Sequence, residues 1–289
     1  MGVDRPLFVV GTGRCGSTIF NDILTRHPDV CWLSRVSERY PHRPAWSGTA
    51  MRVIDLPLMA SLARWRVYPA EAYEFWERCA PGFAAPCRDL TDKDVTPRTK
   101  RRVHAAFAQL PAGRRDRLLV KITGWPRMGF LKEVFPDARF VHVYRDGRAV
   151  ANSWLTMEWF RGWAGPHQWL WGDLTAEQQA LWDRHDRSFV ALGAIAWIRL
   201  MNAFEEARQA VPAADLLEVS YERLCEDPLS VYRDATSFAE LAWYPKFEAH
   251  VRGTRLRNAN PKWQEYLTPA QQHVLEECLT STLERWGYR

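Results

Sequence analysis

The sequence has little that would mark a secreted, membrane-spanning or nucleic-acid-binding protein. Its six cysteines are scattered and none forms a CxxC pair, so we expect reduced thiols in a chain of 289 residues. The apolar run before Gly11 is too short for a signal peptide, and no apolar run reaches the length of a membrane span. Finger-like Cys/His spacings and basic runs interleaved with aromatics are also absent. We therefore expect a cytoplasmic protein with no membrane span and no nucleic-acid partner.

The composition that is present is that of an ordinary globular protein. Hydrophobic residues at 47% and charged residues at 25% exclude disordered and fibrous classes, and 289 residues suffice for a sizeable core. The net charge of +5 suits an anionic ligand but is too small to indicate nucleic acid by itself. The unusual count is the 15 tryptophans, which concentrate in one stretch at Trp154, Trp159, Trp163, Trp169 and Trp171.

Short apolar segments that alternate with helical patterns predict an α/β fold. The expected strands are residues 7–10, 30–33, 118–123, 140–144 and 216–219, and the expected helices include 70–79, 97–110, 130–135 and 187–210. Strands that are apolar throughout are typical of a parallel sheet covered on both faces, so we predict a three-layer fold of the P-loop type with a mostly parallel central sheet. We expect one domain over residues 1–289, with 40–116 as a helical insertion over the active site and the Trp-rich segment 154–185 beside it.

The most informative stretch is the apolar run Leu7–Val10 followed by the glycine-rich turn Gly11–Thr18. The apolar run predicts a buried strand, and a helical pattern begins at Ile19. Glycines in such a turn let backbone N–H groups converge, and the dipole of the following helix adds partial positive charge. The stretch therefore predicts a phosphate-binding site.

The turn is open to three interpretations. Its glycine spacing fits the GxGxxG fingerprint of dinucleotide-binding folds, but the next expected strand leads into Leu33-Ser34-Arg35, without the acidic residue that would bind a ribose. The spacing also fits the P-loop of nucleotide kinases, but Ser17 stands where that loop carries a lysine for the phosphates. The third interpretation keeps the P-loop architecture and places the positive charge earlier, at Arg14.

With its charge at Arg14, the loop resembles that of the sulfotransferases that use 3′-phosphoadenosine-5′-phosphosulfate (PAPS). Arg14-Cys15-Gly16-Ser17-Thr18 fits the family's loop position by position, and the resemblance implies that these residues bind the 5′-phosphosulfate. The family's second cofactor element is a strand followed by an arginine, with a serine in the next helix eight residues after that arginine. The arginine and the serine bind the 3′-phosphate. Arg145 and Ser153 follow the expected strand 140–144 in this pattern. A charged and a neutral donor of this kind suit a single phosphate.

Two supporting similarities extend the resemblance to nearly the whole chain outside residues 40–116. Tyr221, which follows the expected strand 216–219, matches a tyrosine that lies near the adenine in the family. Arg257 lies in a stretch similar to the closing loop that adds a basic residue to the 3′-phosphate site, and Arg252, Arg255 or Lys262 can take the same place.

The resemblance implies transfer of the sulfuryl group from PAPS to a hydroxyl group, with release of adenosine 3′,5′-bisphosphate. Arg14 would stabilise the bridging oxygen of the leaving group, and Lys121, at the end of the expected strand 118–123, would hold the sulfuryl group. The small-molecule branch has a histidine two residues after this lysine, where this chain has Thr123. Other branches use a glutamate soon after the first helix, which makes Glu38 the candidate base. No metal is needed, and no metal-ligating cluster appears in the sequence.

The acceptor is expected to lie between residues 40–116 and the Trp-rich segment. Aromatic side chains there suit a phenol, a sterol-like alcohol, a lipid or the face of a sugar. The sequence predicts neither the acceptor's identity nor the oligomeric state. Two other functions are compatible with a phosphate-binding loop of this kind, namely a degenerate P-loop nucleotide kinase and a non-catalytic nucleotide-binding module.

Overall fold

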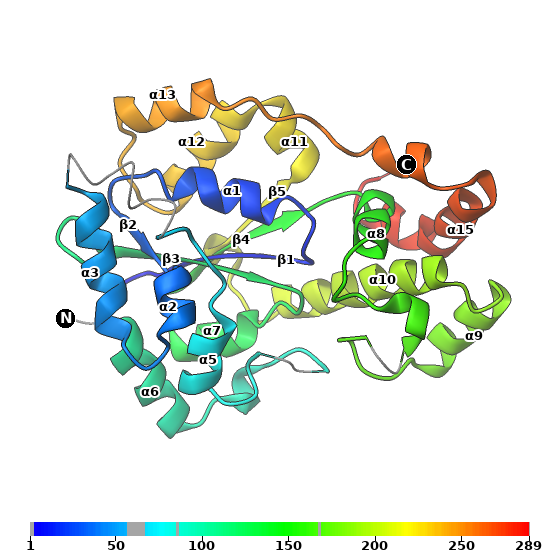
Figure 1. Cartoon of the computed structure of the whole chain (residues 1–289), viewed down its shortest axis with the longest axis horizontal. Coiled ribbons are helices and arrows are strands. Elements are labelled where there is room, and N and C mark those ends of the chain that lie inside the picture. Colours follow the sequence, from blue (N-terminus) through cyan, green and yellow to red (C-terminus); the bar gives the residue numbers. More distant parts are fainter. Residues whose placement is uncertain (1–2, 57–66, 85–86, 167–168, 289) are drawn as a thin grey trace.

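A parallel β-sheet forms the centre of the protein (Figure 1). The computed structural model describes residues 3–56, 67–84, 87–166 and 169–288. Within them the sheet has five strands in the order β2-β3-β1-β4-β5, and every pair is parallel. The strands are β1 (Leu7–Gly11), β2 (Val30–Trp32), β3 (Arg117–Thr123), β4 (Arg139–Tyr144) and β5 (Leu216–Ser220). The predicted α/β fold with a parallel sheet is confirmed.

Strand β1 lies in the middle of the sheet, and all five of its residues are buried. This burial explains why the strand is apolar throughout, since both of its faces pack against other elements. The register aligns Gly11 with Thr123 of β3, and β4 pairs with β5 up to Tyr144 and Ser220. Parallel pairing therefore brings the carboxyl ends of these strands, and the loops that follow them, to one edge of the sheet.

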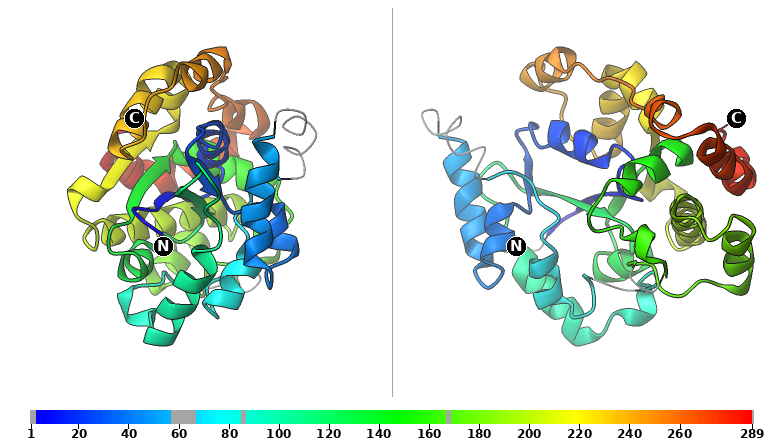
Figure 2. Two further views of the ribbon diagram at one scale, coloured as in Figure 1. Left: turned by 90° about the vertical axis from the view of Figure 1, so that its left-hand side faces the viewer. Right: turned by 45° about the vertical axis from the view of Figure 1, so that its right-hand side comes forward.

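Helices cover both faces of the sheet (Figures 1 and 2). Helices α1 and α12 lie on one face, and α7 and α10 lie on the other. The α-helices of the described residues are α1 (Ser17–Leu24), α2 (Arg35–Arg39), α3 (Pro44–Ile54), α5 (Tyr73–Cys79), α6 (Pro97–Phe107), α7 (Met128–Val134), α8 (Gly147–Leu155), α9 (Ala176–Arg184), α10 (Phe189–Arg208), α11 (Tyr221–Glu226), α12 (Pro228–Phe238), α13 (Pro245–Gly253), α14 (Lys262–Tyr266) and α15 (Pro269–Arg285). No helix among these residues is both long enough and apolar enough to cross a bilayer.

Helix α10 is the long central helix predicted over residues 187–210, and it packs against α8 and α15. It begins at Phe189 because Arg187 has a left-handed backbone with φ 54° and the Ser188 hydroxyl accepts from the Ala191 N–H as the N-cap. Trp197, on its inner face, is fully buried. The side chain of Trp197 lies directly against Gly147 at the start of α8, where an added Cβ would approach the indole to 2.7 Å. Close contact of this kind fixes α8 on α10.

The helix predicted to begin at residue 70 begins at Tyr73 instead. Residues 69 and 70 are extended, because Pro69 forms an antiparallel bridge with Ser34 and the Ala70 N–H donates to the Leu33 carbonyl, and Ala72 then turns with a left-handed φ of 53°. The apolar periodicity of residues 70–79 gave no sign of this pairing, which depends on the residues that follow β2, more than 30 positions earlier in the sequence. The predicted insertion, residues 40–116, contains α3, α5 and α6, and α3 lies at the flank of the protein (Figure 2).

Candidate active site

The loop after β1 has the backbone of a phosphate-binding turn. Gly13, Arg14 and Gly16 have left-handed φ values of 81°, 55° and 94°. Such a conformation costs a non-glycine residue on the order of 1–2 kcal/mol, so its presence at Arg14 indicates that the surrounding contacts hold the arginine in place. Helix α1 begins directly afterwards at Ser17, and the N–H groups of its first turn have no partner within the helix.

Gly16 cannot be replaced without disturbing the site. An added Cβ at this residue would lie 2.5 Å from a ring carbon of Tyr221, which follows β5. The predicted adenine-side tyrosine therefore packs directly on the loop. This contact explains why the loop has a glycine at this position, in addition to the positive φ.

The structure brings the two predicted phosphate elements together. The Arg14 Nε–H donates to the Ser153 hydroxyl at 2.9 Å, and Arg145 Nη1 donates to the Arg14 carbonyl at 3.0 Å. Ser153 lies on α8, whose first turn is capped by the side chain of Asp146. The arginine of the loop, the arginine after β4 and the serine of α8 thus form one connected group.

Arg145 is held from several sides and is only 9% exposed. Its guanidinium lies 4.3 Å from the centre of the Tyr221 ring, a cation–π contact. Its Nε–H donates to the Asn260 side-chain oxygen at 2.8 Å, and Asn260 in turn donates to Glu222 at 2.6 Å. Neither Asn260 nor Glu222 was predicted as a site residue. Both lie far from Arg145 in the sequence, so no local pattern connects them to it.

The segment before α14, residues 254–261, packs against Tyr221 through two hydrogen bonds to its hydroxyl. The Tyr221 hydroxyl donates to the Arg257 carbonyl at 3.0 Å and accepts from the Ala259 N–H at 3.2 Å. The side chain of Arg257 is exposed, as are those of Arg255 and Lys262, while Arg252 pairs with Glu248. The role of Arg257 at the 3′-phosphate stays a prediction, and the contact observed here is made by its backbone.

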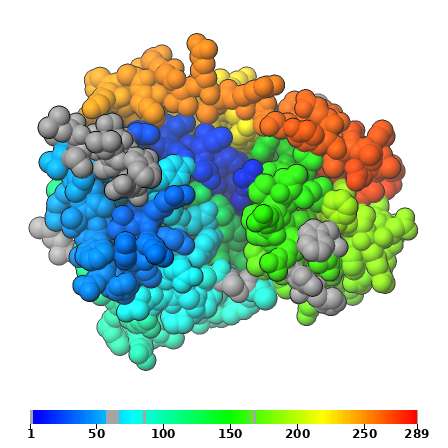
Figure 3. All heavy atoms as spheres, in the orientation of Figure 1, coloured from blue at the N-terminus to red at the C-terminus, as the bar shows by residue number. Residues whose placement is uncertain are grey.

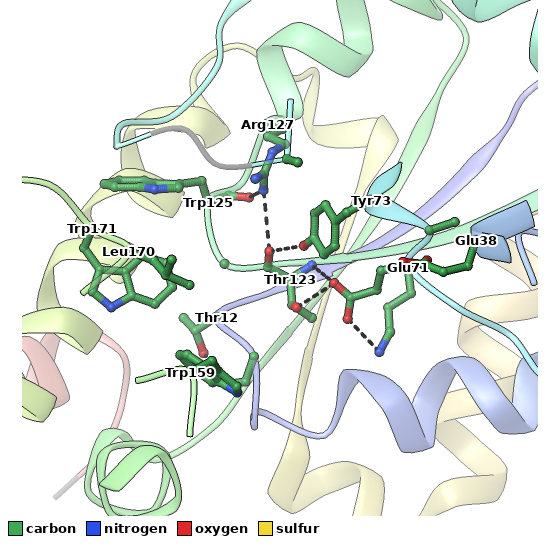
Figure 4. A pocket seen from close by; sticks show the side chains of 15 residues that line it. Thr12, Glu38, Glu71, Tyr73, Thr123, Trp125, Arg127, Trp159, Leu170 and Trp171 are labelled. Atoms are coloured by element: carbon green, nitrogen blue, oxygen red, sulfur yellow. Dashed lines mark hydrogen bonds and ion pairs between the residues drawn. The ribbon is translucent and has the colours of Figure 1, made fainter. Parts of the chain in front are cut away.

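Glu71, a carboxylate from the predicted insertion, lies beside Thr123 at the end of β3 (Figure 4) and pairs with Lys121. Lys121 Nζ lies 2.9 Å from Glu71 Oε1 and donates to the Thr18 hydroxyl at 2.8 Å. Glu71 Oε2 accepts from both the backbone N–H (3.1 Å) and the hydroxyl (2.8 Å) of Thr123. Burial alone would raise the pKa of Glu71, but the Lys121 charge and these hydrogen bonds outweigh it and bring the pKa below its usual range. Glu71 was not predicted as a site residue.

Glu38, the predicted base, lies near this pair. It is on α2, whose start is fixed by a capping box in which the Ser34 and Ser37 side chains each accept from the other's backbone. Partial burial raises the pKa of Glu38, and the negative charges of Glu74 and Glu71 raise it further. Although Glu38 keeps exposure to solvent, a carboxylate with a raised pKa takes a proton more readily than one with the usual pKa.

A cavity of about 570 Å³ opens beside these charged groups. The surface is hollowed between the blue-to-cyan and green parts of the chain, which are the insertion and the Trp-rich segment (Figure 3). The carboxylates Glu38 and Glu71 lie at one side of the cavity, and Trp125, Leu170 and Trp171 lie at the other (Figure 4). The lining residues are Thr12, Gly13, Glu38, Glu71, Ala72, Tyr73, Ala84, Lys121, Thr123, Gly124, Trp125, Arg127, Trp159, Leu170 and Trp171.

The tryptophans of the Trp-rich segment have different positions. Trp159 and Trp171 line the cavity, while Trp154 is fully buried and Trp169 donates to the Gly172 carbonyl. The side chain of Trp163 lies outside the described part of the structure. Among the four tryptophans of the segment whose side chains are described, Trp154 and Trp169 are buried in the core, and Trp159 and Trp171 line the cavity.

Two cavity residues, Trp125 and Arg127, were not predicted. Arg127 is 2% exposed and donates to the carbonyls of Trp125 at 2.9 Å and Phe83 at 3.1 Å, so it holds the turn after β3 in shape. Burial lowers the pKa of Arg127 from its usual value. Among the residues that the structure describes, no group of three or more His, Cys, Asp or Glu side chains is placed to hold a metal ion.

Comparisons with known proteins agree with this arrangement. A family model described as "Sulfotransferase family" matches residues 6–245. The omega-hydroxy-beta-dihydromenaquinone-9 sulfotransferase Stf3 of Mycobacterium bovis is 24% identical, over 99% of this chain and 76% of its own. The sulfotransferase STF9 of Mycobacterium avium is similar in structure, with a TM-score of 0.57 and 19% identity over 99% of this chain and 78% of that one. The sulfotransferase domain from the curacin biosynthetic pathway has a TM-score of 0.53 and 11% identity, over 100% and 99% of the two chains.

The two structural similarities support the fold, and the family model covers most of the chain. The resemblance to the PAPS-dependent enzymes, first noted at Arg14–Thr18 and Arg145, is confirmed. The chain belongs to the sulfotransferase family.

Proposed function

We propose that this sulfotransferase transfers the sulfuryl group from PAPS to the hydroxyl group of an apolar small molecule or lipid. The observation that carries the proposal is the meeting of two phosphate elements and one cavity at the same edge of the sheet. Arg14 and Arg145 are joined through the Arg14 carbonyl, and Lys121 lies between the loop and the cavity. Two phosphate sites next to an acceptor space suit a donor that carries a 3′-phosphate and a 5′-phosphosulfate.

On the donor side, we assign different residues to the 5′-phosphosulfate, the 3′-phosphate and the adenine of PAPS. The loop Gly11–Thr18 and the N-terminus of α1 would bind the 5′-phosphosulfate through backbone N–H groups. The Arg14 guanidinium would stabilise the charge that develops on the bridging oxygen as the S–O bond breaks. Arg145 and Ser153 would bind the 3′-phosphate, and Tyr221 would pack near the adenine. Each of these side chains already has polar or ring contacts that fix its position.

On the acceptor side, the reaction needs a base and a cation. Glu38 would take the proton of the acceptor hydroxyl while the acceptor oxygen forms its bond to sulfur and the bisphosphate leaves. Lys121 would neutralise charge on the sulfuryl oxygens during the transfer. Lys121 and Glu38 both line the cavity, which supports their acting on the same bound acceptor.

The cavity lining favours an acceptor with an apolar body. Trp125, Trp159, Leu170 and Trp171 form much of its wall, and the carboxylates at its other end disfavour an anionic acceptor. The curated relative acts, by its name, on an omega-hydroxylated menaquinone, which is a lipid-like alcohol. We accordingly expect phenols or isoprenoid alcohols to be better acceptors than free sugars. We also expect the protein to work in the cytoplasm, where its cysteines, free in the structure, would stay reduced.

Two measurements test the proposal. Adenosine 3′,5′-bisphosphate should raise the melting temperature, while ATP with magnesium should not, and the opposite result would favour a degenerate nucleotide kinase. Labelled sulfate should then pass from PAPS to an alcohol in a panel of 2-naphthol, farnesol and glucose, with glucose the poorest. Bisphosphate binding without transfer to any hydroxyl of a wider panel would favour a non-catalytic binding module.

A further inference from the structure

The Glu71 carboxylate joins the helical insertion to the part of β3 that carries Lys121 (Figure 4). Neither the family motifs nor the proposed roles use it. We propose that Glu71 is a positioning residue of the transfer reaction, which holds the Lys121 ammonium between the insertion and the loop after β1. The inference rests on the proposed function, because it assigns Glu71 a role in that reaction.

The geometry around Lys121 supports this role. Its ammonium lies between Glu71 Oε1 at 2.9 Å and the Thr18 hydroxyl at 2.8 Å, and the Lys121 side chain is only 13% exposed. A lysine side chain has four rotatable bonds, and fixing it in one position costs on the order of 1.5–2 kcal/mol of conformational entropy. Two oriented acceptors offset this cost before any substrate binds. The ammonium is therefore already placed beside the first turn of α1, where the phosphosulfate is expected.

Glu71 is itself held firmly. Both hydrogen bonds from Thr123 reach its Oε2, and the Tyr73 hydroxyl donates to the Thr123 carbonyl at 2.9 Å. On the other side, the bridge between Pro69 and Ser34 fixes the residues that precede it. The segment that carries Glu71 is thus attached to the end of β3 and to the chain that follows β2. A shift of this segment would move Lys121 with it.

The charges nearby distinguish the roles of Glu71 and Glu38. Both oxygens of Glu71 are engaged, and its pKa is lowered, so it suits holding a cation better than taking a proton. The pKa of Glu38 is raised by partial burial and by the charges of Glu74 and Glu71. The other charged groups here are Lys121, the buried Arg127, Asp22 on α1, and the exposed Arg35 and Arg39 on the same helix as Glu38. Glu71 thus contributes to the basicity of Glu38 as well as to the position of Lys121.

The test compares Glu71→Gln with the wild-type enzyme in single-turnover transfer from PAPS, using the alcohol of the panel that the wild type transfers to fastest. We expect the transfer rate at high pH to fall about 10- to 100-fold, because a misplaced catalytic group costs about that much, while the KM for PAPS changes less than about 3-fold. Bisphosphate binding, measured by calorimetry, should be unchanged. Glu71→Asp, which keeps the charge but shortens the side chain, should lose rate as well.

Glu74→Gln is the matched control. Glu74 is exposed and also raises the pKa of Glu38, but it is not among the residues that line the cavity. Both Glu71→Gln and Glu74→Gln remove a negative charge near Glu38, so the acidic limb of the pH–rate profile should move to lower pH in both. Only Glu71→Gln should also lower the pH-independent transfer rate that the profile reaches at high pH.

Each failure has its own signature. If Glu71→Gln folds and keeps the wild-type transfer rate at high pH, this inference fails while the proposed function stands. The same holds if Glu74→Gln lowers the transfer rate at high pH as much as Glu71→Gln does. If the wild-type protein neither binds the bisphosphate nor transfers sulfate, the proposed function and this inference fail together.

Discussion

At the scale of single residues, Glu38 is the side chain on which turnover should depend most strongly while binding does not. Replacing it by Gln removes the group that takes the acceptor proton and keeps its size, so turnover should fall by about 10²–10⁴. Bisphosphate affinity should stay the same, since Glu38 lies on the acceptor side of the loop.

The pH dependence of the wild-type enzyme gives a second check on Glu38. The base works only when it is ionised, so the rate should fall as the pH drops through its pKa. Burial and the neighbouring carboxylates raise that pKa, so the acidic limb should lie above the ordinary glutamate value of 4.5. Near-normal turnover of Glu38→Gln, or a Glu38→Gln enzyme that keeps the wild-type acidic limb, would remove Glu38 from this role.

Gly16→Ala tests the close approach of the loop and Tyr221. The new methyl group would meet the Tyr221 ring at 2.5 Å, in addition to the strain of alanine at φ 94°. We expect bisphosphate affinity, measured by calorimetry, to fall at least about tenfold. Gly113→Ala is the control, because Gly113 also has a positive φ, 62°, but an added Cβ there meets nothing within 4 Å. It should cost stability and leave the affinity unchanged. Equal affinity losses in the two variants would mean that backbone strain alone is responsible.

At the scale of elements, the segment before α14 should depend on the Tyr221 hydroxyl. Tyr221→Phe keeps the ring on Gly16 and Arg145 but removes the hydrogen bonds to the Arg257 carbonyl and from the Ala259 N–H. Each such bond contributes about 0.5–1.5 kcal/mol, so loss of both should lower bisphosphate affinity by roughly 5- to 160-fold. Hydrogen exchange of residues 254–261 should become faster.

Tyr244→Phe is a suitable control for this prediction. It removes a hydroxyl that donates to Asp29, at 2.9 Å, on another part of the surface. Stability should fall by a similar amount in both variants, and affinity should fall only in Tyr221→Phe. A Tyr221→Phe protein with unchanged exchange and affinity would show that the ring, not the hydroxyl, organises this segment.

The strands were predictable from the sequence because each contains a short, mostly apolar run, which in the central strand β1 reflects burial of all five residues. All five predicted strands lie within about one residue of the observed ones. The candidate site residues Arg14 and Arg145 were predictable because each lies in a short motif that follows a strand, β1 for Arg14 and β4 for Arg145. Glu71 and Asn260 were not, since each acts through a contact distant in sequence: Glu71 with Lys121, and Asn260 with Arg145. The start of α5 was wrong for the same reason, because pairing of residues 69–70 with the chain after β2 replaces the helix there.

At the scale of the whole molecule, the proposed donor site is built from three stretches that are far apart in the chain. They are the loop 11–18, the stretch from Arg145 to Ser153, and the segment 254–261, and hydrogen bonds already join them through Arg14, Arg145 and Asn260. A ligand that contacts all three should stabilise the fold as a unit. At a concentration 100 times its Kd, a ligand adds about 2.7 kcal/mol to the free energy of unfolding.

For a chain of this size, that stabilisation corresponds to a rise in melting temperature of roughly 4–5 °C. With adenosine 3′,5′-bisphosphate, hydrogen exchange should slow in the three donor-site stretches and stay nearly unchanged in residues 67–84, which face the acceptor cavity. The bisphosphate lacks the sulfuryl group that Lys121 would meet, so the Glu71 side of the site has no new contact to make. Protection concentrated in residues 67–84 instead would mean that the bisphosphate occupies the acceptor cavity, and the assignment of donor and acceptor sides would have to be reversed.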